Sequence, residues 1–227
     1  MDEVTNDAST EDHFDADYFE RAALRDGTEV ELRLVRPSDK ALMLEGFQGL
    51  SDRSRYQRFL AAKPRLNSRE LAYLTELDGA RHLAIGALSR DAEGREHPLG
   101  VGRLVVLDDA GRLAEPAVTV VDAAQGKGLG SLLLQRLIAA AGERGVQRFT
   151  CDVLASNRAA IAMLREAAED VEVEIESGVA HVTFALPRVR PAQPHTDPPR
   201  QSALYRYFVA IAEGVLELVR GGDEPRA

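Results

Sequence analysis

The chain has 227 residues, 44% of them hydrophobic, which is enough for one large globular domain or for one domain with extensions. Its net charge of −9 arises mainly in residues 1–20, which hold eight acidic groups and no Lys or Arg, so the remainder lacks the basic excess of a nucleic-acid-binding protein. No apolar run reaches membrane length, Cys151 has no second cysteine to pair with, and the five histidines lack metal-ligand spacing, so we expect a cytoplasmic protein that binds no membrane and no metal.

Short periodic segments fill the first half of the chain. Residues 1–17 are acidic and poor in branched apolar side chains, and we predict a disordered tail there. Apolar and polar residues alternate over 29–36, which predicts a half-buried strand. Helix caps and apolar spacing then predict three short helices, followed by two strands around a polar turn. These five elements are expected over 36–50, 51–60, 67–77, 81–89 and 99–107.

The most informative stretch follows the next predicted strand, over 115–121. Glycines at positions 126, 128 and 130 leave backbone N–H groups uncovered by side chains, so a bulky ligand can approach closely. The predicted helix over 129–143 points the positive end of its dipole at the same place. Together these features predict a site for an anion, most often a phosphate. The spacing fits neither the P-loop nor the dinucleotide-binding pattern, because Ser131 stands where the latter needs its last glycine.

The remaining periodic segments complete an α/β domain that we place over 18–187. They are a strand over 149–154, a helix over 157–168 and a closing hairpin over 171–176 and 179–186. Ser156 is a possible cap for that helix.

The C-terminal part of the chain differs in composition. Five of the ten prolines lie between 187 and 199, which predicts an extended linker over 188–201. Apolar residues recur at helical spacing afterwards, and we predict an amphipathic helix over 202–220. We expect this helix to dock on its own domain or on a second copy, as a homodimer, with recognition of a foreign partner as the alternative.

The pattern Gln125-x-x-Gly128-x-Gly130 resembles the pyrophosphate loop of the GNAT superfamily of acyl-CoA-dependent N-acyltransferases. The resemblance covers about residues 28–187 and implies the GNAT fold, a mixed α/β sheet that splays at its middle so that the cofactor inserts between two strands. Four further stretches resemble bacterial Pat-type protein-lysine acetyltransferases in particular. They are Ala114-Glu115-x-Ala117-Val118, Val35-Arg36-Pro37-x-Asp39, Leu50-Ser51-x-x-Ser54-x-Tyr56-x-Arg58-Phe59 and Leu74-Thr75-x-x-Asp78.

The resemblance implies a site for acetyl-CoA in which the loop binds the diphosphate and a strand backbone binds the pantetheine. It implies Glu115 as the general base for an amine acceptor, although an exposed glutamate at a strand end is the alternative. Asn157 either touches the pantetheine or caps its own helix. The cofactor-binding residues that the resemblance implies are Val118, Thr119, Val120, Gln125, Gly126, Lys127, Gly128, Leu129, Gly130, Ser131 and Asn157.

The sequence departs from the family where many members carry a tyrosine that protonates the CoA thiolate. Leu164 stands there, so the thiolate leaves unassisted or takes its proton from Tyr56, Tyr73 or water. Arg53, Arg55 and Arg58 either shape the acceptor groove or meet the CoA 3′-phosphate.

We therefore expect an N-acetyltransferase that acts on a primary amine, either a protein lysine or a small molecule. The alternative is a non-catalytic acyl-CoA-binding sensor or interaction module of the same fold.

Overall fold

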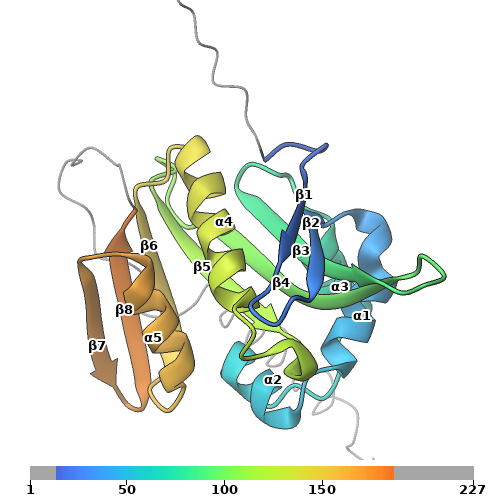
Figure 1. Ribbon diagram of the computed structural model, residues 1–227. Coiled ribbons are helices and arrows are strands. Elements are labelled where there is room, and N and C mark those ends of the chain that lie inside the picture. Colours follow the sequence, from blue (N-terminus) through green and yellow to red (C-terminus); the bar gives the residue numbers. More distant parts are fainter. Residues whose placement is uncertain (1–13, 187–227) are drawn as a thin grey trace, which may run out of the picture.

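A mixed sheet of eight strands organises residues 14–186, which are the residues that this computed structural model describes (Figure 1). The strands are β1 (Phe19–Ala23), β2 (Glu29–Leu34), β3 (His82–Arg90), β4 (Glu96–Val106), β5 (Leu113–Val120), β6 (Arg148–Leu154), β7 (Val171–Glu176) and β8 (Val179–Ala185). The helices are α1 (Lys40–Gln48), α2 (Asp52–Phe59), α3 (Ser68–Thr75), α4 (Leu129–Glu143) and α5 (Arg158–Ala167), with the short 3-10 turns η1 (Pro37–Asp39) and η2 (Asp122–Ala124).

The strands lie in the order β1-β2-β3-β4-β5-β6-β8-β7, and β5 and β6 are parallel to each other while the other neighbours are antiparallel. Strands β5 and β6 pair at just two positions, Leu113 with Arg148 and Ala114 with Phe149, and then diverge (Figure 1). Pro116 follows almost at once and has no N–H to donate to a further strand. The splay expected at the middle of the sheet is therefore present.

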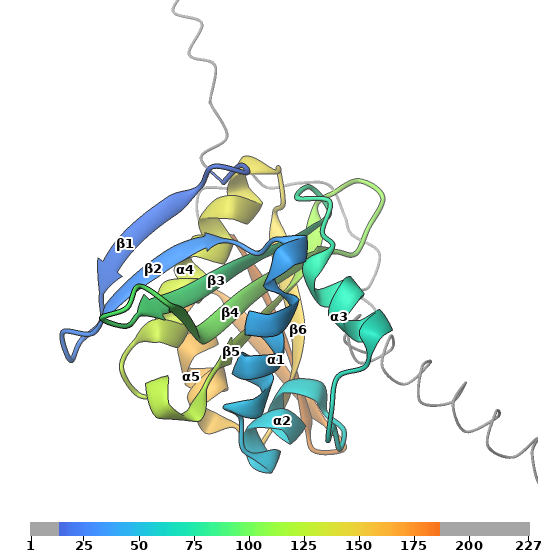
Figure 2. The same cartoon turned by 90° about the vertical axis from the view of Figure 1, so that its right-hand side faces the viewer.

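The two faces of the sheet are covered by different helices. Helices α1, α2 and α3 cover one face, and α4 and α5 lie on the other (Figure 2). Under α4 the core is apolar, and Ile85, Leu104 and Leu137 are completely buried there. A smaller apolar cluster lies among α1, α2 and α3. It consists of Phe47, Leu50, Phe59, Leu66 and Leu74.

The face under α1, α2 and α3 also holds charged side chains. Strand register and the period-two alternation of side chains put Arg33 of β2, Arg103 of β4 and Glu115 of β5 on this face. All three are buried, with exposed fractions of 8%, 2% and 5%. Asp39 neutralises Arg33, because its carboxylate accepts two guanidinium N–H bonds at 2.7 and 2.9 Å.

The predicted helices and strands after residue 28 are present. Their ends shift by at most three residues, except that α1 begins at Lys40, after the 3-10 turn η1, four residues later than predicted. Strand β1 was not predicted, because its sequence Phe-Glu-Arg-Ala-Ala shows no clear alternation of apolar residues. Its pairing with β2 over five residues holds it in the sheet.

The folded unit begins earlier than residue 18. Phe14 is 2% exposed and packs against Tyr18, with ring centroids 4.5 Å apart. The N–H of Phe14 donates to Glu143 and its carbonyl accepts from Arg144, both at the end of α4. Residues 14–17 are therefore part of the domain and not of the predicted disordered tail. The predicted linker over 188–201 and helix over 202–220, with the homodimer expected from it, lie outside the described residues.

Replacing Phe14 by Ala tests this boundary. We expect Phe14→Ala to lower the free energy of unfolding by about 3 kcal/mol, because a buried aromatic side chain is lost from the core. Phe19 is 50% exposed, so Phe19→Ala is the matched control, with an expected change of about 0.5 kcal/mol. Urea unfolding followed by circular dichroism measures both, and equal losses would contradict the assignment.

Candidate active site

The divergence of β5 from β6 opens a cleft of about 490 Å³. Its walls come from the edge of β5 over residues 115–120, from Cys151, Asp152 and Val153 of β6, and from α5. The other edge of β5 is paired with β4. The edge that faces the cleft has no partner strand beyond Ala114 among the described residues. Its N–H and C=O groups can therefore bind a ligand that lies along the strand, apart from the carbonyl of Val120, which accepts a hydrogen bond from the Gln125 side chain.

The glycine-rich loop closes one end of the cleft. Gly126 and Gly128 adopt φ angles of +75° and +93°, which residues with a Cβ rarely adopt. Helix α4 starts directly afterwards, at Leu129, so its first N–H groups have no partner within the helix. None of the N–H groups of residues 126–128 donates a hydrogen bond to the described part of the chain. The loop therefore presents a row of backbone donors at a helix N-terminus, the arrangement that binds phosphate groups.

Glu115 lies on the cleft wall and is 5% exposed, so it is not the exposed strand-end glutamate that was the alternative. Arg58 of α2 and Cys151 of β6 line the same cleft, and the charge of Glu115 acts on both. Burial and the Glu115 carboxylate raise the pKa of the Cys151 thiol well above its usual range, so this thiol stays protonated. Cys151 is thus a buried structural cysteine and not a nucleophile.

Two arginines under α1, α2 and α3 keep their charge despite burial. Burial lowers the pKa of Arg58 to about 10, and the nearby Glu115 carboxylate opposes this effect. Burial and the charge of Arg58 lower the pKa of Arg103 to about 9. His82 accepts a hydrogen bond from Arg103, and burial together with the Arg103 charge lowers its pKa to about 4. At neutral pH the imidazole of His82 is therefore neutral, while both guanidinium groups are charged.

Comparison with known proteins agrees with this geometry. Residues 51–168, just over half of the chain, match the model of the acetyltransferase (GNAT) family. The chain belongs to the GNAT family of acetyltransferases. It is 35% identical over 143 residues to the acetyltransferase Pat of Mycolicibacterium smegmatis, a match that covers 60% of this chain and 40% of Pat. It is 30% identical over 137 residues to an acetyltransferase of Pseudomonas aeruginosa, which covers 60% of this chain and 73% of that protein.

A solved structure extends the comparison to the fold. The GNAT domain of S. lividans PAT superposes with a TM-score of 0.68 at 29% sequence identity, over 76% of this chain and 99% of that domain. Against the Pat of M. smegmatis, in contrast, this chain spans less than half of the relative's length. Acetyl-CoA is the typical co-substrate of the family, and the cleft fits it. The backbone N–H groups of the glycine-rich loop can donate to a diphosphate. The backbone groups along the cleft-facing edge of β5 can form hydrogen bonds with an extended chain that contains amides.

The GNAT cleft collects most, but not all, of the residues that the sequence suggested for cofactor binding. Lys127 and Leu129 do not line it. The ammonium group of Lys127 pairs with Asp26 at 3.0 Å, and the side chain of Leu129 is 1% exposed in the core. The amide of Gln125 donates to the carbonyl of Val120 at 3.1 Å, so this side chain fastens the loop to the end of β5. The residues from the prediction that line the cleft are Glu115, Val118, Thr119, Val120, Gln125, Gly126, Gly128, Gly130, Ser131 and Asn157.

Other residues reach this cleft from distant parts of the chain. The side chain of Arg25 packs against Gly128, and Met163 of α5 packs against Gly130. Asp152 lines the cleft and is held by His181 of β8, with 2.6 Å between the carboxylate and the ring nitrogen. Arg25 and Asp152 carry no motif, and strand pairing and loop packing alone place them at the cleft.

No group of three His, Cys, Asp or Glu side chains within residues 14–186 is arranged to hold a metal ion. No helix in the same range is long and apolar enough to span a membrane.

Helix α5 shows how the family pattern is altered. Asn157, and not Ser156, caps the helix, because its side-chain oxygen accepts the N–H of Ala160 at 3.2 Å. Asn157 also lines the cleft, so capping and ligand contact are compatible. Leu164, in the position of the family tyrosine, is 4% exposed and gives the cleft an apolar wall.

The cap makes a separate prediction for Asn157. We expect Asn157→Ala to lower the free energy of unfolding by about 1 kcal/mol, because the N–H of Ala160 loses its acceptor. Asn157→Ser should keep most of the stability, since a serine hydroxyl accepts the same bond. Thermal and urea unfolding of the three proteins measure the difference. Equal stability of the Ala and Ser variants would show that the cap contributes nothing.

Proposed function

We propose that the protein transfers an acetyl group from acetyl-CoA to a primary amine by direct attack, with Glu115 as the general base. One observation supports this proposal above the others. The edge of β5 that faces the cleft runs from the buried carboxylate of Glu115 to the glycine-rich loop, whose backbone N–H groups are exposed. All three line the same cleft. A ligand with a diphosphate at one end and a thioester at the other would lie with its reactive carbonyl close to Glu115.

The chain's part in binding is to supply backbone donors and acceptors. The N–H groups over residues 126–131 would bind the diphosphate at the N-terminus of α4. Residues 118–120 of β5 would pair with the pantetheine amides as an added strand would. A free N–H of the same edge would stabilise the negative charge that develops on the thioester oxygen during attack. Because these donors belong to a strand and a helix, they are fixed before the substrate binds.

The acceptor amine must lose a proton before it attacks, since a lysine side chain has a pKa of about 10.4 in water. Glu115 would take this proton, directly or through one water molecule. The amine nitrogen then forms a bond to the thioester carbon, the carbon–sulfur bond breaks, and the electron pair leaves on sulfur as a thiolate. The nitrogen releases its second proton to solvent as the amide forms.

Protonation of the thiolate needs no dedicated acid in this scheme. Leu164 cannot donate a proton, and the Cys151 thiol is held protonated by burial and a neighbouring carboxylate. A thiol has a pKa of about 8.5, so the thiolate is a fair leaving group near neutral pH and can be protonated by water afterwards.

The acceptor that we propose is the side chain of a protein lysine. The resemblance of the stretches around Glu115 and Arg58 to Pat-type enzymes supports this choice over a small molecule. A non-catalytic acyl-CoA sensor remains the second candidate, and Leu164 is the observation that favours it, because the family tyrosine is absent.

Binding of the diphosphate by the loop is tested with two glycines of similar backbone geometry. Gly126 in the cleft and Gly111 in the β4–β5 turn have φ angles of +75° and +71°, and a Cβ would meet no atom within 4 Å at either position. Alanine should be strained equally at both sites, so each substitution should lower the free energy of unfolding by a similar amount, about 1 kcal/mol. We expect Gly126→Ala to weaken acetyl-CoA binding tenfold or more and Gly111→Ala to leave it unchanged, as measured by calorimetry. Equal affinities would contradict diphosphate binding at this loop.

Replacement of Glu115 by Gln separates the enzyme from the sensor. We expect Glu115→Gln to lower kcat at least 100-fold in a thiol-release assay with acetyl-CoA and a lysine peptide, because the general base is lost. Its acetyl-CoA affinity should stay within about twofold, since the proposed binding groups are backbone atoms. Glu29→Gln, at an exposed strand start, is the control that keeps full activity. Acetyl-CoA binding with no turnover in the wild type would support the sensor.

A further inference from the structure

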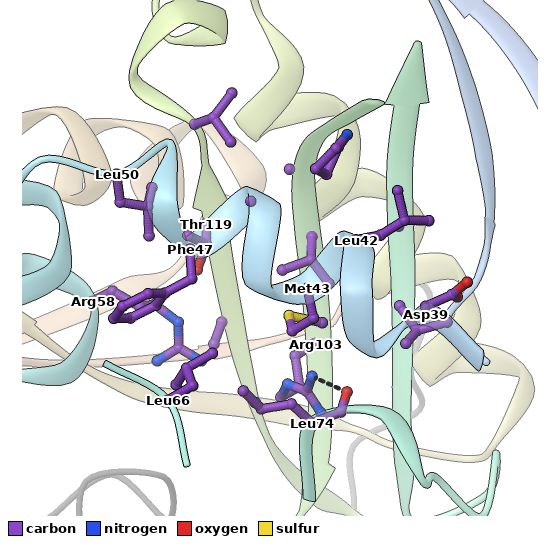
Figure 3. A pocket seen from close by; sticks show the side chains of 18 of the residues that line it. Asp39, Leu42, Met43, Phe47, Leu50, Arg58, Leu66, Leu74, Arg103 and Thr119 are labelled. Atoms are coloured by element: carbon purple, nitrogen blue, oxygen red, sulfur yellow. Dashed lines mark hydrogen bonds between the residues drawn. The ribbon is translucent and has the colours of Figure 1, made fainter. Parts of the chain in front are cut away.

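A second pocket adjoins the proposed acetyl-CoA cleft on the α1 side of the sheet (Figure 3). Its walls are mostly apolar side chains of α1, α2 and α3, and its floor is formed by β3, β4 and β5. Leu50, Arg58, Ala117 and Thr119 line both the pocket and the cleft, so the two spaces meet at these residues. The cavity volume is about 80 Å³, which corresponds to roughly three water molecules at about 30 Å³ each. The pocket therefore has room for a chain of only a few heavy atoms.

The charges of this apolar pocket do not balance. Arg33 and Asp39 line it as an ion pair, and the Arg33 guanidinium also donates to Glu96 at 3.0 Å, so Arg33 is fully paired. Arg103 is 2% exposed, and its guanidinium donates to two neutral groups. These are the carbonyl of Leu74 at 2.7 Å (Figure 3) and the ring of His82 at 2.5 Å. Arg103 forms no ion pair with a carboxylate of the described residues.

Arg58 adds a second positive charge at the junction of pocket and cleft. Its guanidinium lies 5.4 Å from the ring centroid of Phe59 and forms no hydrogen bond or ion pair with any residue in 14–186. Glu115 attracts it from the cleft side, and Arg103 repels it from the floor of the pocket. The two guanidinium groups carry like charges and repel each other, and an anion bound between them would relieve this repulsion.

We propose that this pocket binds the terminal carboxylate of a short acyl chain, so that the protein uses dicarboxylic acyl-CoA thioesters of malonyl or succinyl length. This inference rests on the proposed function, because it places the thioester carbonyl beside β5. Arg58 is the specificity-determining residue at the entrance, where its free N–H groups can bind a carboxylate in a bidentate fashion. Arg103 supplies a second positive charge at the floor. The methylene groups of the chain would lie against the apolar walls.

The carboxylate could enter on the acyl group or on the acceptor amine, and the geometry favours the acyl group. Ala117 and Thr119, which line the shared boundary, lie on the strand along which the thioester is proposed to run. Glu115, which marks the acceptor side, lines the cleft but not the pocket. A chain that enters the pocket therefore starts from the thioester carbonyl and not from the amine.

Thiol-release kinetics with a matched pair of thioesters test the proposal. Succinyl-CoA and butyryl-CoA have acyl chains of equal carbon number and differ in a terminal carboxylate, and acetyl-CoA serves as the reference. With one lysine peptide as acceptor, and with blanks that lack enzyme, we expect kcat/KM for succinyl-CoA to exceed that for butyryl-CoA at least tenfold. A ratio of one or less in the wild type would overturn the proposal.

Variants identify the residues responsible. Arg58→Gln should lower the succinyl-to-butyryl ratio about tenfold, and Arg58→Lys should restore part of it, because a positive charge returns without the planar fork. Arg69→Gln on the neighbouring helix α3 is the matched control, since Arg69 is exposed and lines neither space. Calorimetric affinities for succinyl-CoA should follow the same order. Arg103→Met provides a second test of the pocket charge if thermal unfolding shows that it folds.

Two further results would count against the proposal in distinguishable ways. If wild-type turnover with acetyl-CoA is normal and Arg58→Gln leaves the succinyl-to-butyryl ratio unchanged, the pocket proposal fails while the acetyltransferase assignment stands. If β-alanine is preferred over propylamine as the acceptor of acetyl-CoA, and Arg58→Gln removes that preference, the carboxylate belongs to the acceptor and the acyl assignment is wrong. Absence of turnover with every thioester would instead reject the proposed function itself.

Discussion

The structure depends on the short contact between β5 and β6. The two strands pair at two positions, and beyond Ala114 the edge of β5 that faces β6 has no neighbouring strand within residues 14–186. Unpaired backbone groups in a protein interior are costly, so a continuous sheet would close this gap. The open edge is tolerated because a cleft runs beside it. The position of the glycine-rich loop, of α4 and of Glu115 follows from where this edge begins and ends.

The sheet separates two kinds of environment. On the face under α4, the aliphatic side chains of the sheet are fully buried. This packing holds β5, the strand that leads into the glycine-rich loop, in place. Under α1, α2 and α3 it buries charged side chains, among them Arg33, Arg103 and Glu115. Buried charges seldom add stability, because desolvation offsets their mutual attraction. Their presence on one face points to chemistry there, and the apolar face opposite carries the stability of the domain.

The order of elements after residue 28 and the location of the anion-binding loop were predictable from local signals. Gly126 and Gly128 adopt the left-handed backbone for which glycine is suited, and α4 begins at Leu129 as its apolar pattern indicates. Glu115 was identified as a candidate from a motif of adjacent residues, and the structure adds its burial. These predictions succeed because each depends on residues that are neighbours in the chain.

Sequence by itself thus determined which segments are strands and helices and where backbone donors are exposed. The tertiary structure decided which distant residues contact these segments. Phe14 packs in the core, Arg25 lies against Gly128, and Arg103 donates to the neutral groups of Leu74 and His82. Strand β1 likewise exists through its pairing with β2. Such contacts join residues far apart in sequence, and register, loop packing and burial fix them jointly. Local periodicity and spacing carry no information on contacts between residues that are far apart in sequence. These contacts could therefore be identified only from the fold.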